Sequence, residues 1–217
     1  MRVVYLHGFA SSPQSTKARF FGDHFAEAGV AFDAPQLDEG QFHNLTITGQ
    51  MLVVGKAVAT QAEKLTPGEP LVLMGSSLGG YLAALYAARH PRYVDRLVLL
   101  APAFRFLERW RVRLSPTEIE QWKRDGSILM YHYGSKTAQR LGYQFLEDAA
   151  GYEAVPDFHQ RALILHGTND TVVPCQVSYD FALEHVHARL ALFESGHELT
   201  DVLEGLWREA SAFLEIP

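Results

Sequence analysis

Residues 73–91 read LMGSSLGGYLAALYAARHP and pass from an apolar run through a glycine-rich turn into a helical pattern. The apolar run from Leu71 to Met74 is typical of a strand buried on both faces, and the spacing from Leu78 to His90 is helical. Between them, Gly75-Ser76-Ser77-Leu78-Gly79 matches the pattern G-x-S-x-G. In this context the central serine occupies a strained turn that points its hydroxyl away from the sheet, and small neighbours let the backbones approach. Ser77 is therefore a candidate nucleophile, and Ser76 is its neighbour in the turn.

The rest of the chain repeats this alternation of strand and helix. Further short apolar runs predict strands at Val3–Leu6, Val30–Ala34, Leu97–Ala101, Ala162–Leu165 and Leu190–Phe193. Helical periods occur at Thr16–Ala28, Leu45–Leu65, Pro174–Val186 and Asp201–Leu214. Alternating strands and helices imply parallel pairing with right-handed crossovers. The expected fold class is α/β, with a mainly parallel open sheet of about six strands and helices on both faces.

Residues 103–159 break the alternation, because they contain no convincing strand. Within them, Ser115 as N-cap, Pro116 in the first turn, Glu118 completing a capping box and Gly126 as a stop predict one helix. A second helix is expected from Thr137 to Ala149. We therefore expect one domain, residues 1–217, with a small helical cap insertion at about residues 103–159. The cap would consist of two or three short helices above the carboxyl edge of the sheet.

Composition and charge narrow the class of ligand. The 217 residues are 47% hydrophobic and 20% charged, as in an ordinary globular protein, and the formal net charge of −6 disfavours non-specific nucleic-acid binding. The apolar run that begins at Val3 stops at His7, which is too short for a signal peptide or a membrane span and predicts a cytoplasmic protein. One cysteine excludes an intrachain disulfide, and no metal or organic cofactor is expected.

A serine hydroxyl needs an adjacent base, and that base needs a third group to orient it. Asp170 in LHGTNDTVVP and His197 in FESGHEL each lie just beyond the carboxyl end of a predicted strand. Each residue alone could be an ordinary turn residue, but the order Ser77, Asp170, His197 is the one that this architecture uses. Asp157 and Asp201 are rival acids, but neither lies at the carboxyl end of a strand.

Catalysis at Ser77 would also need backbone N–H donors for a developing oxyanion. The turn supplies the N–H of Leu78. The loop after the first strand, YLHGFASSP, supplies a second donor, with Phe9 as first choice and Ala10 as second. His7 in this loop is more consistent with a hydrogen bond that braces the loop than with a catalytic role.

Together these motifs resemble a known family. YLHGFASSPQSTKARFF, PQL, GSSLGGY, HGTNDTVVP and SGH are similar to the α/β-hydrolase superfamily, and particularly to its small YqiA/YcfP-like esterase branch. The resemblance is strong over the first hundred residues and reaches the level of motifs over the last sixty. It implies an α/β-hydrolase fold and esterase or thioesterase activity, with the triad on Ser77, Asp170 and His197 and oxyanion donors at Phe9 and Leu78. Residues 103–159 match no pattern of the family.

The expected activity is that of a serine hydrolase, a carboxylesterase or thioesterase that cleaves a small acyl ester or thioester through an acyl-enzyme. Phe42, Trp110 and Tyr131 are candidates for an apolar acyl pocket. The arginines of RFLERWRVR could receive an anion, but a solvated helix face is the preferred explanation for them. Peptidase and C–C hydrolase chemistry share the same triad, and a catalytically silent binding protein with this fold is the rival from another class. A nucleotide-binding protein would need a glycine pattern that is absent from the sequence.

Overall fold

A computed structural model of the chain describes residues 1–216 and contains a six-stranded, all-parallel sheet with the strand order β2-β1-β3-β4-β7-β8. The strands of this sheet are β1 (Arg2–Leu6), β2 (Ala31–Asp33), β3 (Leu71–Ser76), β4 (Arg96–Leu100), β7 (Arg161–Gly167) and β8 (Ala188–Phe193). The helices that cover it are α1 (Thr16–Glu27), α2 (Ile47–Ala62), α3 (Leu78–Arg89), α7 (Gln176–Glu184) and α8 (Leu203–Leu214). The predicted sheet and its covering helices are thereby confirmed.

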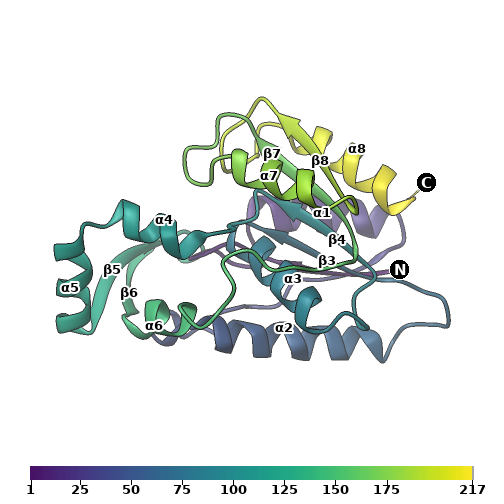
Figure 1. The fold of residues 1–217 in the computed structure, drawn as a ribbon. Coiled ribbons are helices and arrows are strands. Elements are labelled where there is room, and N and C mark those ends of the chain that lie inside the picture. Colours follow the sequence, from purple (N-terminus) through teal and green to yellow (C-terminus); the bar gives the residue numbers. More distant parts are fainter. Residues whose placement is uncertain (217) are drawn as a thin grey trace.

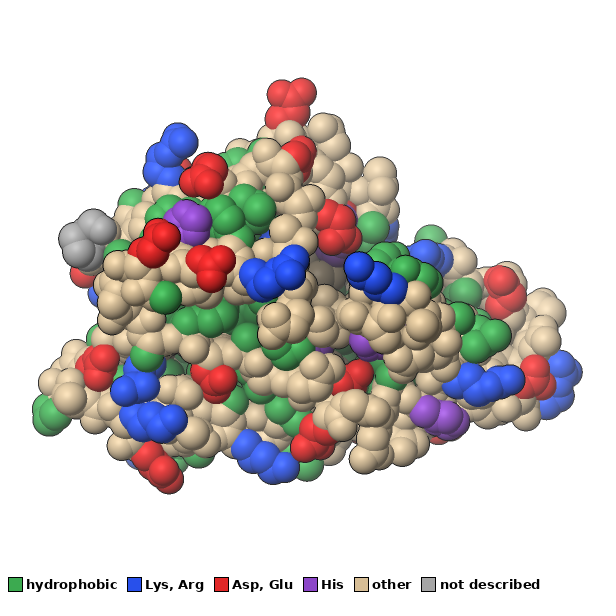
Figure 2. All heavy atoms as spheres, turned by 180° about the vertical axis from the view of Figure 1, so that it is seen from behind, with side chains coloured by type: hydrophobic (Ala, Val, Ile, Leu, Met, Phe, Trp, Pro, Cys, Tyr) green, Lys and Arg blue, Asp and Glu red, His purple; other side chains and the backbone are tan. Residues whose placement is uncertain are grey.

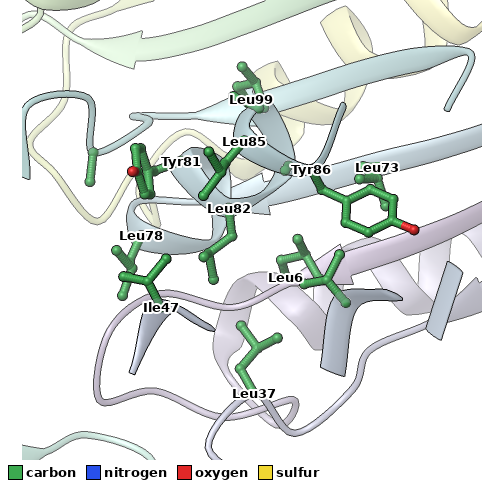
Figure 3. Packing of buried hydrophobic residues seen from close by; sticks show 14 of the residues in the cluster. Leu6, Leu37, Ile47, Leu73, Leu78, Tyr81, Leu82, Leu85, Tyr86 and Leu99 are labelled. Carbon is green, nitrogen blue, oxygen red and sulfur yellow. The ribbon is translucent and has the colours of Figure 1, made fainter. Parts of the chain in front are cut away.

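Successive side chains of each strand point to opposite faces of the sheet, and each face has its own core. Val3 and Tyr5 of β1 pack in a cluster with residues of α1 and α8, and Val4 and Leu6 pack in a second cluster with residues of α2 and α3. Figure 1 shows α1 and α8 on one side of the sheet and α2 and α3 on the other. Figure 3 shows part of the second cluster, where Leu82 of α3 lies near Leu6.

The order of the strands reverses between β1 and β3, because the chain builds outward to β2 on one side and to β8 on the other. At such a reversal the loops that leave the carboxyl ends of the two strands diverge and leave a crevice, which is where open α/β sheets bind ligands. Leu6 at the end of β1 pairs with Gly75 in β3. The loop after β1 and the turn that contains Ser77 therefore begin side by side.

The prediction of a strand-free segment between β4 and β7 is wrong in one part. The helices there are α4 (Phe106–Arg113), α5 (Pro116–Asp125) and α6 (Gln144–Ala149), and α5 has the predicted capping box. However, β5 (Ser127–His132) and β6 (Thr137–Gly142) form an antiparallel hairpin, so only the last part of the helix expected from Thr137 to Ala149 exists.

Pairing and burial explain why Thr137–Gly142 is extended. Cross-strand hydrogen bonds to β5 replace the bonds of a helix, and the turn that joins the strands contains Lys136 with φ +57°. Leu141 of β6 is buried, and its carbonyl oxygen accepts a hydrogen bond from the buried indole of Trp122 in α5 at 3.0 Å. Tertiary contacts of this kind override a weak local helical preference.

The charged side chains on the face shown in Figure 2 are mixed in sign, with acidic and basic groups interspersed. Among the helices of residues 1–216, none combines the length and the hydropathy needed to cross a membrane.

Candidate active site

Ser77 lies between β3 and α3 with φ 54° and ψ −117°, a backbone conformation that a residue with a side chain seldom adopts. Its N–H donates to the carbonyl oxygen of Leu100 at 2.8 Å, and its own carbonyl oxygen accepts from the N–H groups of Ala103 and Tyr81 at 3.0 and 3.1 Å. These bonds to β4, to the segment after β4 and to α3 hold the strained turn in place.

Glycines on both sides of Ser77 are required by close backbone approach. A Cβ atom on Gly75 would overlap the carbonyl group of Gly79, and a Cβ atom on Gly79 would overlap the carbonyl oxygen of Leu6 in β1. At Gly80 a Cβ would lie 3.1 Å from both the Gly75 oxygen and the Cα atom of Pro102. The start of α3 therefore sits against β1 and β3 at distances that only glycine permits.

The two predicted partners of Ser77 meet it at the carboxyl edge of the sheet. Nε2 of His197 lies 2.9 Å from Oγ of Ser77, and Nδ1 of His197 lies 2.7 Å from Oδ2 of Asp170. His197 follows β8 and Asp170 follows β7. These two strands are neighbours in the sheet, and their last residues, Gly167 and Phe193, are paired. The rival acids lie elsewhere, since Asp201 bonds Ser195 and Asp157 faces His185.

The Asp170 carboxylate is buried and surrounded by donors. Oδ1 accepts the N–H groups of Val172 and Val173 at 2.8 and 2.7 Å, and Oδ2 accepts from His197. Burial by itself would raise the pKa of Asp170, but hydrogen bonds from His166, His197 and Val173 outweigh it and hold the pKa well below its usual value. Asp170 is therefore ionised at neutral pH and fixes the Nδ1–H tautomer of His197.

The loop after β1 approaches the same point. A Cβ atom on Gly8 would lie 3.5 Å from the Cβ of Ser77, so this loop touches the serine. Nδ1 of His7 donates to the Gly8 carbonyl at 3.0 Å, and its Nε2 accepts from the Leu37 N–H at 3.2 Å, so His7 braces the loop as expected. Burial lowers the pKa of His7, in keeping with a neutral ring.

Two of the three predicted pocket residues gather around Phe9. The Phe9 ring lies 5.5 Å from Phe42 and 5.2 Å from Trp110 of α4. Phe145 of α6, which the sequence reasoning did not single out, lies 5.6 Å from Phe9. Tyr131 is apart from these rings, because it is 53% exposed on the hairpin and packs against Tyr133. The helices between β4 and β7 thus supply aromatic rings to the loop that carries Phe9.

Lys17 was not anticipated at all. It lies in the first turn of α1, is buried, and donates from Nζ to the carbonyl oxygen of Glu198 at 2.5 Å, next to His197 in the chain. Burial lowers the pKa of Lys17. Lysine is ordinarily a surface residue, so nothing in the sequence pattern distinguishes this one from its exposed counterparts.

A buried histidine–aspartate pair joins the hairpin to the loop after β2. Nε2 of His132 lies 3.3 Å from Oδ2 of Asp38, with both side chains almost fully buried. The N–H of Ser135 donates to Nδ1 of His132, so the proton of a neutral ring is on the nitrogen that faces Asp38. Nearby, the N–H of Gly134 donates to the carbonyl oxygen of Ala10 at 3.2 Å. The hairpin is therefore attached both to the loop after β2 and to the loop after β1.

Replacing Asp38 with alanine is expected to lower the free energy of unfolding by about 2–4 kcal/mol, because the buried Nε2 of His132 loses the carboxylate that faces it and Gln36 and Gly40 lose an acceptor. Burial tends to raise the pKa of Asp38, but hydrogen bonds from Gln36 and Gly40 and the nearby His132 lower it overall. A depressed pKa gives stabilisation that is complete above the pKa of an unfolded aspartate, about 3.9, and that is lost as pH falls through the folded-state value.

Urea unfolding at pH 7 and at successively lower pH measures this effect. The control is Glu39→Gln, which removes an exposed charge 3.7 Å from Lys56 and should change stability by less than about 1 kcal/mol. Equal stabilities for the two variants at pH 7 would show that the buried pair contributes nothing.

The sheet order, the crossover helices and the residues at the strand ends define an α/β-hydrolase fold. The chain belongs to the Uncharacterised protein family (UPF0227), which it matches over residues 2–215. This is the YqiA/YcfP-like family that the motifs indicated.

Among residues 1–216, no group of three or more histidine, cysteine, aspartate or glutamate side chains is arranged to hold a metal ion.

Several solved structures share the fold. Alpha/beta hydrolase domain-containing protein 10 from mouse is 21% identical, with a TM-score of 0.78 over 99% of this chain and 89% of that one. Est1E from Butyrivibrio proteoclasticus, with ferulic acid bound, is 20% identical, with a TM-score of 0.78 over 99% and 89%. A structure from the work on the metagenome-derived lipolytic enzymes LipS and LipT is 22% identical, with a TM-score of 0.77 over 99% and 93%.

One curated protein matches a short piece of the chain. The protein of Oryza sativa subsp. japonica named "Probable 1-acylglycerol-3-phosphate O-acyltransferase" is 53% identical over 32 residues. The match covers 15% of this chain and 8% of the rice protein.

Proposed function

We propose that this protein is a serine hydrolase that cleaves acyl esters or thioesters through an acyl-enzyme intermediate. The observation that carries the proposal is the chain of contacts from Ser77 Oγ to His197 Nε2 at 2.9 Å and from His197 Nδ1 to Asp170 Oδ2 at 2.7 Å. In this arrangement a weak nucleophile contacts a base, and an ionised carboxylate orients that base.

The reaction would proceed in two stages. Ser77 Oγ attacks the acyl carbonyl carbon as His197 Nε2 takes its proton, and His197 then returns that proton to the departing alcohol or thiol. A water molecule, deprotonated by His197, attacks the acyl-enzyme and releases the acid and free Ser77. Asp170 holds the His197 tautomer throughout and stabilises the charged ring that forms twice.

The developing oxyanion would accept from the N–H groups of Leu78 and Phe9. Leu78 begins α3, where backbone N–H groups have no partner within the helix, and Phe9 follows the glycine that touches Ser77. Phe9, Phe42, Trp110 and Phe145 favour an apolar acyl group. We propose residues 103–159 as a cap, because α4 and α6 supply two of these rings.

Known proteins of this fold support the same class of chemistry. They include an esterase with ferulic acid bound and lipolytic enzymes, although the likeness at these identities concerns the fold. A catalytically silent binding protein with this fold would have no need for the contacts among Ser77, His197 and Asp170. Peptidase and C–C hydrolase activities employ the same groups, and substrate panels distinguish them.

A fluorophosphonate probe tests the proposal, since it labels an activated serine covalently. Wild type and Ser76→Ala are expected to be labelled at Ser77, and Ser77→Ala is expected to show no labelling. Ser76 is the matched control, because it is the adjacent serine and its side chain is buried at the end of β3. Equal labelling of wild type and Ser77→Ala, or no labelling of either, would contradict the proposal. A panel of p-nitrophenyl esters and acyl thioesters of graded length then defines the acyl group.

A further inference from the structure

His166 is a buried histidine beside the candidate site to which the proposed reaction assigns no step. It lies in β7, four residues before Asp170, and its side chain is fully buried. Its Nε2 lies 2.8 Å from the carbonyl oxygen of Val173 and 3.2 Å from Oδ2 of Asp170. Its Nδ1 lies 2.7 Å from Oγ of Ser178, a fully buried residue in α7.

The partners of His166 determine which of its nitrogens carries a proton. A carbonyl oxygen and an ionised carboxylate only accept hydrogen bonds, so Nε2 must be the donor that faces Val173 and Asp170. In the neutral ring Nδ1 is then an acceptor, and the Ser178 hydroxyl is its donor. Ser178 therefore holds His166 in the tautomer that donates toward Asp170.

Asp170 Oδ2 consequently lies between two imidazole rings, His166 Nε2 on the inner side and His197 Nδ1 on the outer side. Oδ1 is occupied by the N–H groups of Val172 and Val173. Since His166 contacts both the carboxylate of Asp170 and the carbonyl of Val173, it joins Asp170 to a point three residues further along the same loop. Rotation of the carboxylate away from His197 would break both sets of bonds.

We propose that His166 is a positioning residue for Asp170, held in its donor tautomer by Ser178, so that Ser178, His166, Asp170, His197 and Ser77 form one continuous hydrogen-bonded chain. This inference rests on the proposed function of Ser77 and His197. His166 touches no reacting atom and acts only through Asp170.

The arrangement has a consequence for the pH dependence of the reaction. Each donor to the Asp170 carboxylate withdraws some of the negative charge that would otherwise stabilise protonated His197. The charged and titratable groups around Asp170 and His197 are His166 from β7, Glu198 beside His197 in the loop after β8, and Lys17 from α1, whose Nζ lies 4.0 Å from the Glu198 carboxylate. Removing the His166 donor leaves the others in place, so it should favour protonated His197 and move the acid limb of the profile to higher pH.

The experiment compares His166→Gln, whose amide can donate from a similar position, with His166→Phe, which keeps a flat ring and no donor. The rate of fluorophosphonate labelling and kcat/KM for a p-nitrophenyl ester are measured from pH 5 to 9. We expect His166→Phe to lower kcat about 10- to 100-fold with little change in KM, and to move the acid limb upward by about half a pH unit. His166→Gln should retain most of the rate and the wild-type limb. Ser178→Ala should have a kcat and an acid limb between those of His166→Phe and His166→Gln.

A structural role alone predicts a different pattern. If His166→Gln and His166→Phe lose kcat equally and both keep the wild-type acid limb, the proposal is overturned. Histidine ring NMR of the same variants, with the His197 signal assigned by its loss in His197→Gln, follows protonation of His197 without any substrate. An upward movement of that titration in His166→Phe but not in His166→Gln supports the proposal even if esters prove to be the wrong substrates, and no movement opposes it. Absence of labelling in wild type would count against the proposed function and not against this measurement.

Discussion

Replacing His197 with alanine is expected to lower kcat/KM toward an activated acyl ester by about 10⁴- to 10⁶-fold while the protein stays folded. Among residues 1–216, the His197 ring is the group that hydrogen-bonds Ser77 Oγ, so without it the serine loses its proton acceptor and the leaving alcohol loses its proton donor. Asp170→Asn should cost about 10⁴-fold, because the amide no longer holds the productive tautomer of His197. Steady-state kinetics on p-nitrophenyl esters measure both losses.

His43→Ala is the matched control for His197→Ala, since His43 is an exposed histidine in the short 3-10 helix Phe42–Asn44. It should retain wild-type kinetics. Circular dichroism establishes that each variant is folded. A folded His197→Ala variant that keeps more than about a tenth of the wild-type rate would be incompatible with His197 as the base.

Gly79→Ala should prevent the chain from forming a stable native state, with a loss of more than about 4 kcal/mol in the free energy of unfolding. The added methyl group would overlap the carbonyl oxygens of Leu6 and His7, which belong to the backbone of β1 and its loop. Backbone atoms cannot rotate aside as a flexible side chain can, so α3 would have to move off the sheet. Soluble yield and urea unfolding are the measurements.

Gly55→Ala provides the control for this prediction. Gly55 lies inside α2, and a Cβ there would make an ordinary contact of 3.7 Å with the Tyr86 ring. Alanine favours a helix over glycine by about 0.5–1 kcal/mol, so this variant should be as stable as wild type or more stable. Comparable stability of Gly79→Ala and Gly55→Ala would mean that α3 leaves room for a methyl group beside the backbone of β1.

Much of the fold was predictable because its signals are local. Buried parallel strands produce continuous apolar runs, and each run at Leu71, Leu97 and Ala162 became a strand of the sheet. A parallel sheet brings the carboxyl ends of all its strands to one edge, so three residues that follow three strands could be placed near one another without coordinates. That is why the proximity of Ser77, Asp170 and His197 could be anticipated.

The parts that escaped prediction depend on contacts between distant segments. The segment from Thr137 has a composition compatible with a helix, and only pairing with Ser127–His132 makes it extended. Tyr131 lies on the exposed face of that hairpin. Its exposure follows from the alternation of side chains along a strand, whereas helices were expected in this segment. Lys17 and Glu198 are 181 residues apart, and no local pattern records such a contact. His166 lay within a recognised motif, but its role depends on Ser178 in the next helix.

The attachment of the hairpin to the loops after β1 and β2 also determines which segments must be exchanged together in a chimaera of this protein with another of the same fold. A graft that exchanged residues 103–159 for a foreign cap would leave Asp38 without His132, and the Ala10 carbonyl without the N–H of Gly134. The chimaera would therefore combine the foreign cap with a less firmly held loop around Phe9. A chimaera that keeps these contacts has to exchange residues 36–42 together with residues 103–159, although the two segments are far apart in the sequence.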